Sequence, residues 1–217
     1  MAAQTLDAAG FVVVRKPECI ATTSPDSSNM LRRPPGKLIY YHGIDRDPWE
    51  EISLRYYAKK LPKNISAEYD RMRDRNRAIG LATDCNDNYD RALEILEFSN
   101  TGADRDELII VQAPWVKEGL HTIPIDGLSI EWLGYDCGSP GEWSLILQGC
   151  FWNPQPLPTH AERLNGYGLF DEWTDCEGLY VDYVEASRDD SVEPLCDHPE
   201  WCSVRIGRVQ TANSEKK

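Results

Sequence analysis

Apolar runs and alternating apolar and polar positions predict a series of short strands along the chain. The continuous run FVVV at residues 11–14 is typical of a buried strand, whereas the alternation LSIEWL at 128–133 is typical of a strand with one solvent face. Glycine and proline bound several of these runs, as they commonly do at strand ends. The predicted strands cover residues 11–14, 37–41, 107–114, 128–133, 141–149 and 201–209.

Between these strands, apolar residues at helical spacing predict about four to five helices. Asp47 followed by Pro48 has the features of a helix start, and Ser66 is the expected cap of the next helix, which ends at Gly80. Further helices are predicted at about residues 87–98, 159–166 and within 171–190. Short strands interleaved with helices, and a β-rich C-terminal half, predict an α+β fold, with a mixed α/β fold as the alternative.

A change in charge near residue 120 suggests two regions. Residues 1–120 carry a net charge of −2, whereas residues 121–217 carry −11. We therefore predict an N-terminal mixed helix and strand region at 1–120 and an acidic, β-rich region with one exposed helix at 121–210. The two regions can equally form a single domain. The polar end at 211–217 is predicted to be disordered.

The termini, the cysteines and the net charge together predict a soluble, cytoplasmic protein. The first 20 residues lack a basic start followed by an apolar run, and no apolar window approaches the roughly 18 residues that span a bilayer. Seven widely spread cysteines fit free thiols in a reducing compartment better than a disulfide framework. A net charge of −13 repels nucleic acid and anionic membranes and attracts basic proteins, which are the predicted partners.

The segment 196–202 contains the pattern that most resembles a metal site. Cys196, His198 and Cys202 offer three zinc ligands, but structural zinc sites use two closely spaced pairs, and Cys-x₅-Cys is not such a spacing. A disulfide, buried thiols or unrelated cysteines are the alternatives. No histidine lies in a nucleophile signature, so we expect no cofactor and no catalytic residue. A hydrolase with a Cys–His or metal site remains an alternative function.

The most acidic part of the chain coincides with the helix predicted within 171–190. Residues 171–200 hold eleven acids and one arginine, a net charge of −10. Thr174 and Glu177 have the spacing of a capping box, so the acids up to Glu177 have a local role at the positive helix N-terminus. Later acids lack this role, because the dipole disfavours them at the C-terminal end. We predict that these acids bind a partner, with two aromatic anchors, unless they serve only solubility. The predicted partner-binding residues are Asp182, Glu185, Asp189, Asp190, Glu193, Trp173 and Tyr180.

Four arginines at alternate positions form the basic cluster of the second helix. Arg71, Arg73, Arg75 and Arg77 fan over most of the helix circumference. One interpretation is a solvated helix with local ion pairs to neighbouring acids, and the other is a docking site for an acidic group.

In size, acidity and lack of catalytic signatures, with the segment 171–193 as its centre, the chain resembles the small immunity proteins that bacteria make against their own toxins. The resemblance implies an intracellular inhibitor that covers a toxin domain, often a nuclease or another enzyme with a cationic cleft. No residue role follows from it, because it rests on overall properties. The sequence therefore predicts an acidic binding protein that neutralises a basic partner. The alternatives are the hydrolase and a subunit of a larger assembly.

Overall fold

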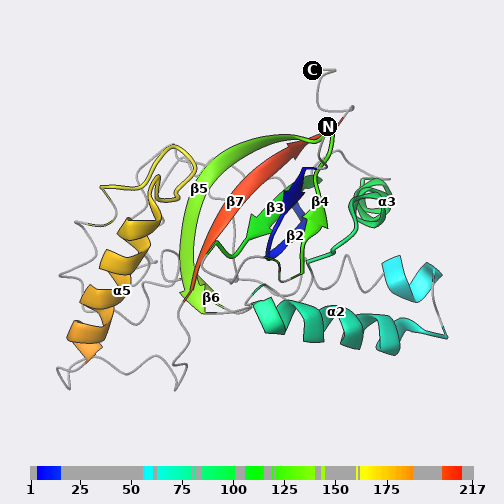
Figure 1. Ribbon diagram of the computed structural model, residues 1–217, viewed down its shortest axis with the longest axis horizontal. Helices are drawn as coiled ribbons and strands as arrows, with labels where there is room; N and C mark the ends of the chain where they lie inside the picture. The colour runs from blue at the N-terminus through cyan, green and yellow to red at the C-terminus, as the bar shows by residue number, and fades with distance from the viewer. Residues whose placement is uncertain are drawn as a thin grey trace, which may run out of the picture. The chain divides into compact units, whose positions relative to one another are not determined.

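The computed structural model describes residues 4–15, 56–60, 63–79, 81, 85–100, 106–114, 119, 121–139, 143–144, 160, 162–187 and 202–211. Its strands are β1 (Thr5–Leu6), β2 (Ala9–Arg15), β3 (Asp106–Gln112), β4 (Ile123–Pro124), β5 (Ser129–Ser139), β6 (Trp143–Ser144) and β7 (Cys202–Gln210). Its helices are α2 (Ile65–Ile79), α3 (Tyr89–Ser99) and α5 (Trp173–Ser187), and residues 56–60 are also helical (Figure 1). The predicted α+β class is confirmed.

A five-stranded sheet in the order β2-β3-β7-β5-β6 forms the framework, and β1 and β4 pair in a separate two-stranded sheet. Strands β2 and β3 are antiparallel, with Phe11 opposite Ile110 and Val13 opposite Leu108. Both strands are buried on both faces, as their continuous apolar runs predicted. The C-terminal strand β7 lies between β3 and β5, so the end of the chain completes the middle of the sheet (Figure 1).

The chain forms two compact units, each built from segments that are distant in sequence. The first unit contains residues 1–16, 45–132 and 206–217, and the second contains residues 17–44 and 133–205. Strands β5 and β7 therefore contribute residues to both units. These segments are not the contiguous ranges 1–120 and 121–210, and that division stays a prediction.

The core of the first unit lies between β2, β3 and the helical segments. Tyr56 and Tyr57 are buried beside Met72 of α2 and Ile95 of α3, and all four pack with Phe11 of β2 in one apolar cluster. The rings of Tyr56 and Tyr57 meet edge to face, with centroids 5.4 Å apart. Both side chains are almost completely buried. Large aromatic side chains at helix–sheet contacts bury much apolar area, which is the main stabilising term of such a core.

In the second unit, a compact turn precedes α5 and is fixed to β5. Asn165 organises this turn, because its Oδ1 accepts hydrogen bonds from the backbone N–H groups of Tyr167 and Leu169. Its Nδ2 donates to the carbonyl of Leu133 in β5 at 2.7 Å. Phe170 is paired with Tyr135 of β5 through two backbone hydrogen bonds of 2.7 and 3.0 Å. The chain therefore enters α5 from a rigid support.

The positions of the helix starts correct two predicted caps. Helix α2 begins at Ile65 and its first hydrogen bond goes to the carbonyl of Asn64, so Ser66 lies inside the helix. Helix α5 begins at Trp173, so Thr174 lies in the first turn and does not cap it. Helix α3 starts after Asn88, whose Oδ1 accepts from the Arg91 backbone N–H.

Several predictions fall on residues outside the described part of the chain. These are the strand at 37–41, the helix start at Asp47, most of the strand at 141–149 and the C-terminal residues 212–217. The helix predicted at 159–166 is wrong over residues 162–166, which form turns and an isolated bridge from Leu164 to Phe170. There the Asn165 side chain accepts hydrogen bonds from the backbone N–H groups of Tyr167 and Leu169, which favours a turn over a helix. Among the helices that the structure describes, none is long and apolar enough to cross a membrane.

Candidate functional site

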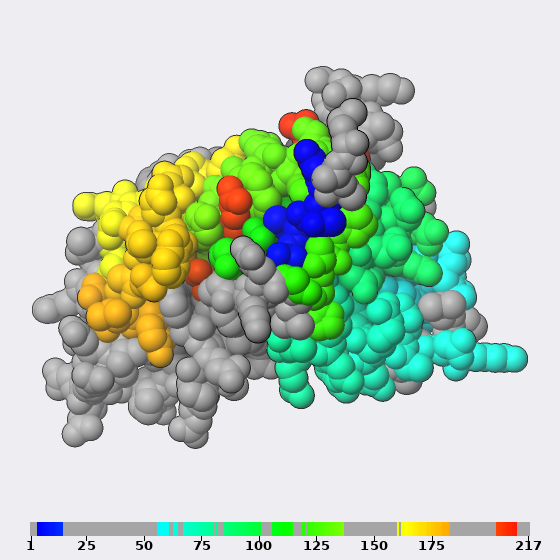
Figure 2. All heavy atoms as spheres, viewed as in Figure 1, coloured from blue at the N-terminus to red at the C-terminus, as the bar shows by residue number. Residues whose placement is uncertain are grey.

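Helix α5 presents one face to solvent and packs the other into the second unit. Cys176 and Leu179 are buried, whereas Trp173 is 43% exposed and Val181 is 51% exposed. Within the described residues these two are the large apolar side chains that remain exposed, and both lie on α5. Figure 2 shows α5 in orange at the surface of the molecule.

The inner side of α5 and the residues just before it are fastened by polar contacts from the preceding turn. His160 Nε2 lies 2.6 Å from Asp182 Oδ2, and Arg163 donates to Asp175. Asp171, two residues before α5, accepts a hydrogen bond of 2.8 Å from the amide of Asn165. Three carboxylates in and beside the acidic helix thus have a structural role. The sequence alone predicted that these acids interact with the helix dipole or with a partner.

Asp182 is the predicted binding residue whose surroundings the structure changes most. Its carboxylate pairs with the buried His160, although its side chain remains 47% exposed. Tyr180 is half-buried, and Trp173 is exposed as an anchor requires. The side chain of Glu185 and the whole of Asp189, Asp190 and Glu193 lie outside the described residues, so their role stays a prediction.

His160 and Asp182 form the arrangement in which a carboxylate orients a histidine, and such pairs serve some enzymes as general bases. Here the remaining nitrogen, Nδ1, is buried and has no hydrogen-bond partner among the described residues. The ring lies edge-on to Phe170, and a Cβ atom at Gly178 would be 3.8 Å from its Cε1. Because this packing encloses the ring, it favours a structural histidine that holds α5 over a base that meets a substrate.

The zinc interpretation of residues 196–202, which their spacing did not favour, is not tested by the structure. Cys196 and His198 lie outside the described residues, and only the backbone of Cys202, at the start of β7, lies within them. In the part of the chain that the structure describes, no three His, Cys, Asp or Glu side chains gather as a metal site would require. The zinc interpretation and its alternatives at 196–202 stay predictions.

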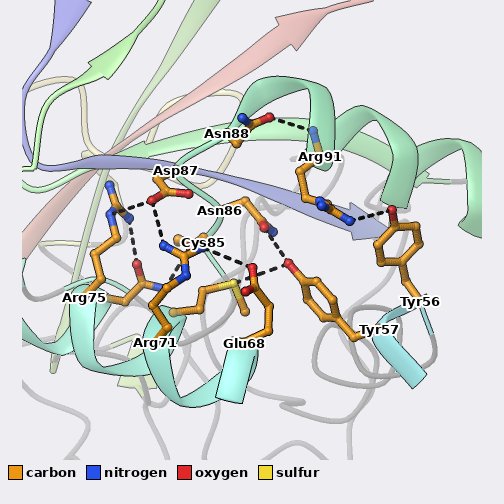
Figure 3. Close-up of polar contacts among 12 residues, drawn as sticks. Tyr56, Tyr57, Glu68, Arg71, Arg75, Cys85, Asn86, Asp87, Asn88 and Arg91 are labelled. Carbon is orange, nitrogen blue, oxygen red and sulfur yellow. Dashed lines mark hydrogen bonds and ion pairs between the residues drawn. The ribbon is translucent and has the colours of Figure 1, made fainter. Parts of the chain in front are cut away.

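A second polar feature, in the first unit, escaped the sequence analysis. It is a hollow of about 330 Å³ between α2, the residues before α3, and α3. Figure 3 shows Arg71 between Glu68 and Asp87 on one side of the hollow, and Arg91 directed toward Tyr56 on the other. We call it the α2–α3 hollow, and it is lined by Glu68, Arg71, Asn86, Asp87, Asn88, Asp90, Arg91 and Glu94.

Charges in the α2–α3 hollow largely compensate one another. Arg71 pairs with Glu68 at 3.1 Å and with Asp87 at 3.3 Å. Arg91 donates to the Tyr56 hydroxyl at 3.1 Å (Figure 3). This hydroxyl in turn donates to Glu94. The hydrogen bond from Tyr56 lowers the pKa of Glu94, whereas burial raises the pKa of Tyr56. The guanidinium groups of Arg71 and Arg91 therefore both bind groups within the protein. These contacts connect α2 and α3 to neighbouring segments, which indicates a structural role for the hollow.

Beneath the hollow, one arginine of the predicted basic cluster is buried. Arg75 donates to the carbonyl of Ala9 at 2.5 Å and to Asn76 Oδ1 at 2.8 Å. Arg71 and Arg73 instead make local ion pairs on the helix surface, as the first interpretation of the cluster predicted. Arg75 lies three residues after the buried Met72, so both residues are on the same face of α2. This spacing is the sequence feature that distinguishes Arg75 from Arg71 and Arg73.

Tyr57 anchors the segment before α3 from the core side. Its hydroxyl donates to Asn86 Oδ1 at 2.8 Å, and burial raises its pKa to about 12. Asn86 also pairs with Phe11 through two backbone hydrogen bonds of 2.7 Å. These contacts fix the residues that line the hollow, which supports a structural role for it.

Comparisons of this chain with protein families, with curated proteins and with solved structures found no match. The site must therefore be chosen on physical grounds. Both arginines that line the α2–α3 hollow are engaged within the fold, whereas the outer face of α5 exposes Trp173 and Val181 with the carboxylate of Glu177 between them. The outer face of α5 is the stronger candidate for an external partner.

Proposed function

We propose that this chain is an acidic binding protein that neutralises a basic protein partner, as an immunity protein does with its cognate toxin. The proposal depends on one observation, which is that α5 combines exposed apolar side chains with a high local negative charge. Trp173 and Val181, the large apolar side chains left exposed in the described residues, lie on the most acidic segment of the chain. Exposed apolar groups rimmed by charge are typical of protein-binding surfaces.

The charge distribution supports a basic partner. Residues 171–200 carry a net charge of −10, and a local field of this sign accelerates the encounter with a cationic surface and opposes association with nucleic acid. An inhibitor gains from this acceleration, because it must cover its target before the target acts. Apolar contacts from α5 then slow dissociation once the surfaces meet.

The first experiment asks whether a basic partner exists and whether charge drives its binding. The full chain is immobilised at low salt, proteins from the native host are captured, and a candidate is then purified and measured alone. We expect a 1:1 complex whose association rate falls several-fold between about 50 and 500 mM salt, because the Debye length shortens from about 14 to 4 Å. Expression of the partner alone should be toxic, and co-expression of this chain should restore growth.

A charge reversal locates the effect on the acidic segment. Asp189→Lys with Asp190→Lys should slow association roughly three- to tenfold. The matched control, Asp74→Lys with Glu97→Lys, changes the net charge equally at exposed positions of α2 and α3 and should leave association nearly unchanged. Failure to find a basic partner, or equal effects of the two double variants, would rule the proposed function out.

A further inference from the structure

On the outer face of α5, an acidic side chain lies between two exposed apolar side chains. Trp173, Glu177 and Val181 are spaced four residues apart, so they lie one above the other on the same side of the helix. With a rise of about 1.5 Å per residue, the two apolar residues are separated by about 12 Å along the helix axis, with the carboxylate residue between them. We call these residues the α5 stripe.

We propose that the α5 stripe is the recognition element for the basic partner, and that the partner offers two apolar contacts about 12 Å apart with a lysine or arginine between them. This inference rests on the proposed function and specifies the chemistry of its partner. Trp173 and Val181 are 43% and 51% exposed, which leaves apolar surface on α5 that a partner can cover. Glu177 is partly exposed between them and supplies the charge that pairs with the cation.

The fastening of the opposite side determines which face a partner meets. Asp182 contacts His160 at 2.6 Å, Asp175 accepts from Arg163, and Leu179 is buried. These contacts hold the backbone of α5 against rotation, so the ordering cost at binding falls mainly on the side chains of the stripe. Asp182 belongs to the supporting side and is not part of the recognition element.

Charge also selects among the possible occupants of this surface. A second copy of the chain would place Glu177 and the surrounding carboxylates against an identical set, and like charges in contact oppose association. A basic protein meets the same surface with complementary charge. A partner with a cation placed between two apolar contacts can bind the stripe in one alignment only. A surface that is merely cationic lacks this specificity.

The inference is tested on the purified partner with single substitutions in the full chain. Trp173→Ala should weaken the complex at least about tenfold, chiefly through faster dissociation, because a half-exposed tryptophan at the centre of an interface is a strong anchor. Val181→Ala should weaken it about three- to fivefold. Glu177→Gln should weaken it at low salt and lose its effect at high salt. Glu97→Gln, an exposed site on α3, is the matched control and should bind as the unmodified chain does.

The outcomes separate this inference from the proposed function. If the Asp189→Lys/Asp190→Lys variant binds poorly while all three stripe variants bind normally, the partner uses the acids alone and the stripe is refuted, although the proposed function stands. If no basic partner is found, both are refuted. If the free chain self-associates and Trp173→Ala makes it monomeric, a second copy occupies the stripe, and the inference is wrong. Circular dichroism and thermal unfolding should show that each variant keeps its fold, because all three side chains are at least partly exposed.

Discussion

At Gly134 in β5, an added methyl group should destabilise the turn before α5, which is paired with β5. Its φ is +141°, a backbone conformation that side chains with a Cβ atom rarely adopt. A Cβ atom built there would lie 2.6 Å from the carbonyl oxygen of Phe170 and 2.8 Å from the Cβ of Leu169. The Phe170 carbonyl accepts the 2.7 Å hydrogen bond from Tyr135, so it cannot retreat without weakening that bond.

The expected cost of Gly134→Ala has two parts. Holding alanine in a sparsely populated backbone region costs about 1–3 kcal/mol. Displacing Phe170 weakens two backbone hydrogen bonds to Tyr135, at about 1 kcal/mol each. We therefore expect the free energy of unfolding to fall by about 3–5 kcal/mol. Urea titration followed by tryptophan fluorescence and by circular dichroism measures this change.

Two other glycines separate the contributions. At Gly127, φ is +73° and an added Cβ atom meets nothing within 4 Å, so Gly127→Ala should cost only the backbone strain, about 1 kcal/mol. At Gly166 the space is also open and φ is not positive, so Gly166→Ala should be nearly neutral. The reasoning is refuted if Gly134→Ala costs no more than Gly127→Ala, because the close approach to Phe170 would then have no energetic consequence.

Three further substitutions test the polar contacts. Tyr57→Phe leaves the buried Asn86 Oδ1 without its hydroxyl donor and should lower the free energy of unfolding by about 1–2 kcal/mol, measured by urea titration. Tyr56→Phe should reduce the loss of stability on acidification. The Tyr56 hydrogen bond lowers the pKa of Glu94 below its usual value of 4.5, so its contribution is present above that pH and disappears as the pH falls through the lower folded value. Melting temperatures at intervals from pH 6 to 3 measure this difference, and parallel curves for the two proteins would contradict it. Asp182→Ala removes the contact to the histidine beneath α5 and should speed hydrogen exchange of α5 amides while leaving exchange in α3 unchanged.

Local patterns in the sequence predicted the regular elements well. The apolar runs of β2 and β3 and the helical spacing of α3 and α5 each reflect a face that must be buried, and burial is the main driving force of folding. Helix starts were predicted less well. Ser66 and Thr174 are good capping residues by type, but the helices begin one residue before each of them. The start of a helix depends on how the preceding chain enters it, which tertiary contacts determine.

Charged residues were the least predictable part of the candidate site. The sequence predicted both Asp182 and Arg75 at the surface, Asp182 with an external partner and Arg75 with neighbouring acids or a docked acidic group. The partner of Asp182 is His160, 22 positions earlier, and that of Arg75 is the Ala9 carbonyl, 66 positions earlier. Helical spacing relates residues within one element and carries no information about contacts of this range.

The sequence by itself determined the α+β class, the helix within 171–190 and the concentration of negative charge on it, because these depend on composition and on short-range periodicity. Only the tertiary structure decided which side of α5 faces outward. The turn around Asn165 and the contacts to Asp175 and Asp182 fix the helix by its inner side, and this leaves Trp173 and Val181 in solvent. The physical reason is that burial of one face of a helix requires a surface to receive it, and that surface is assembled from segments distant in the chain.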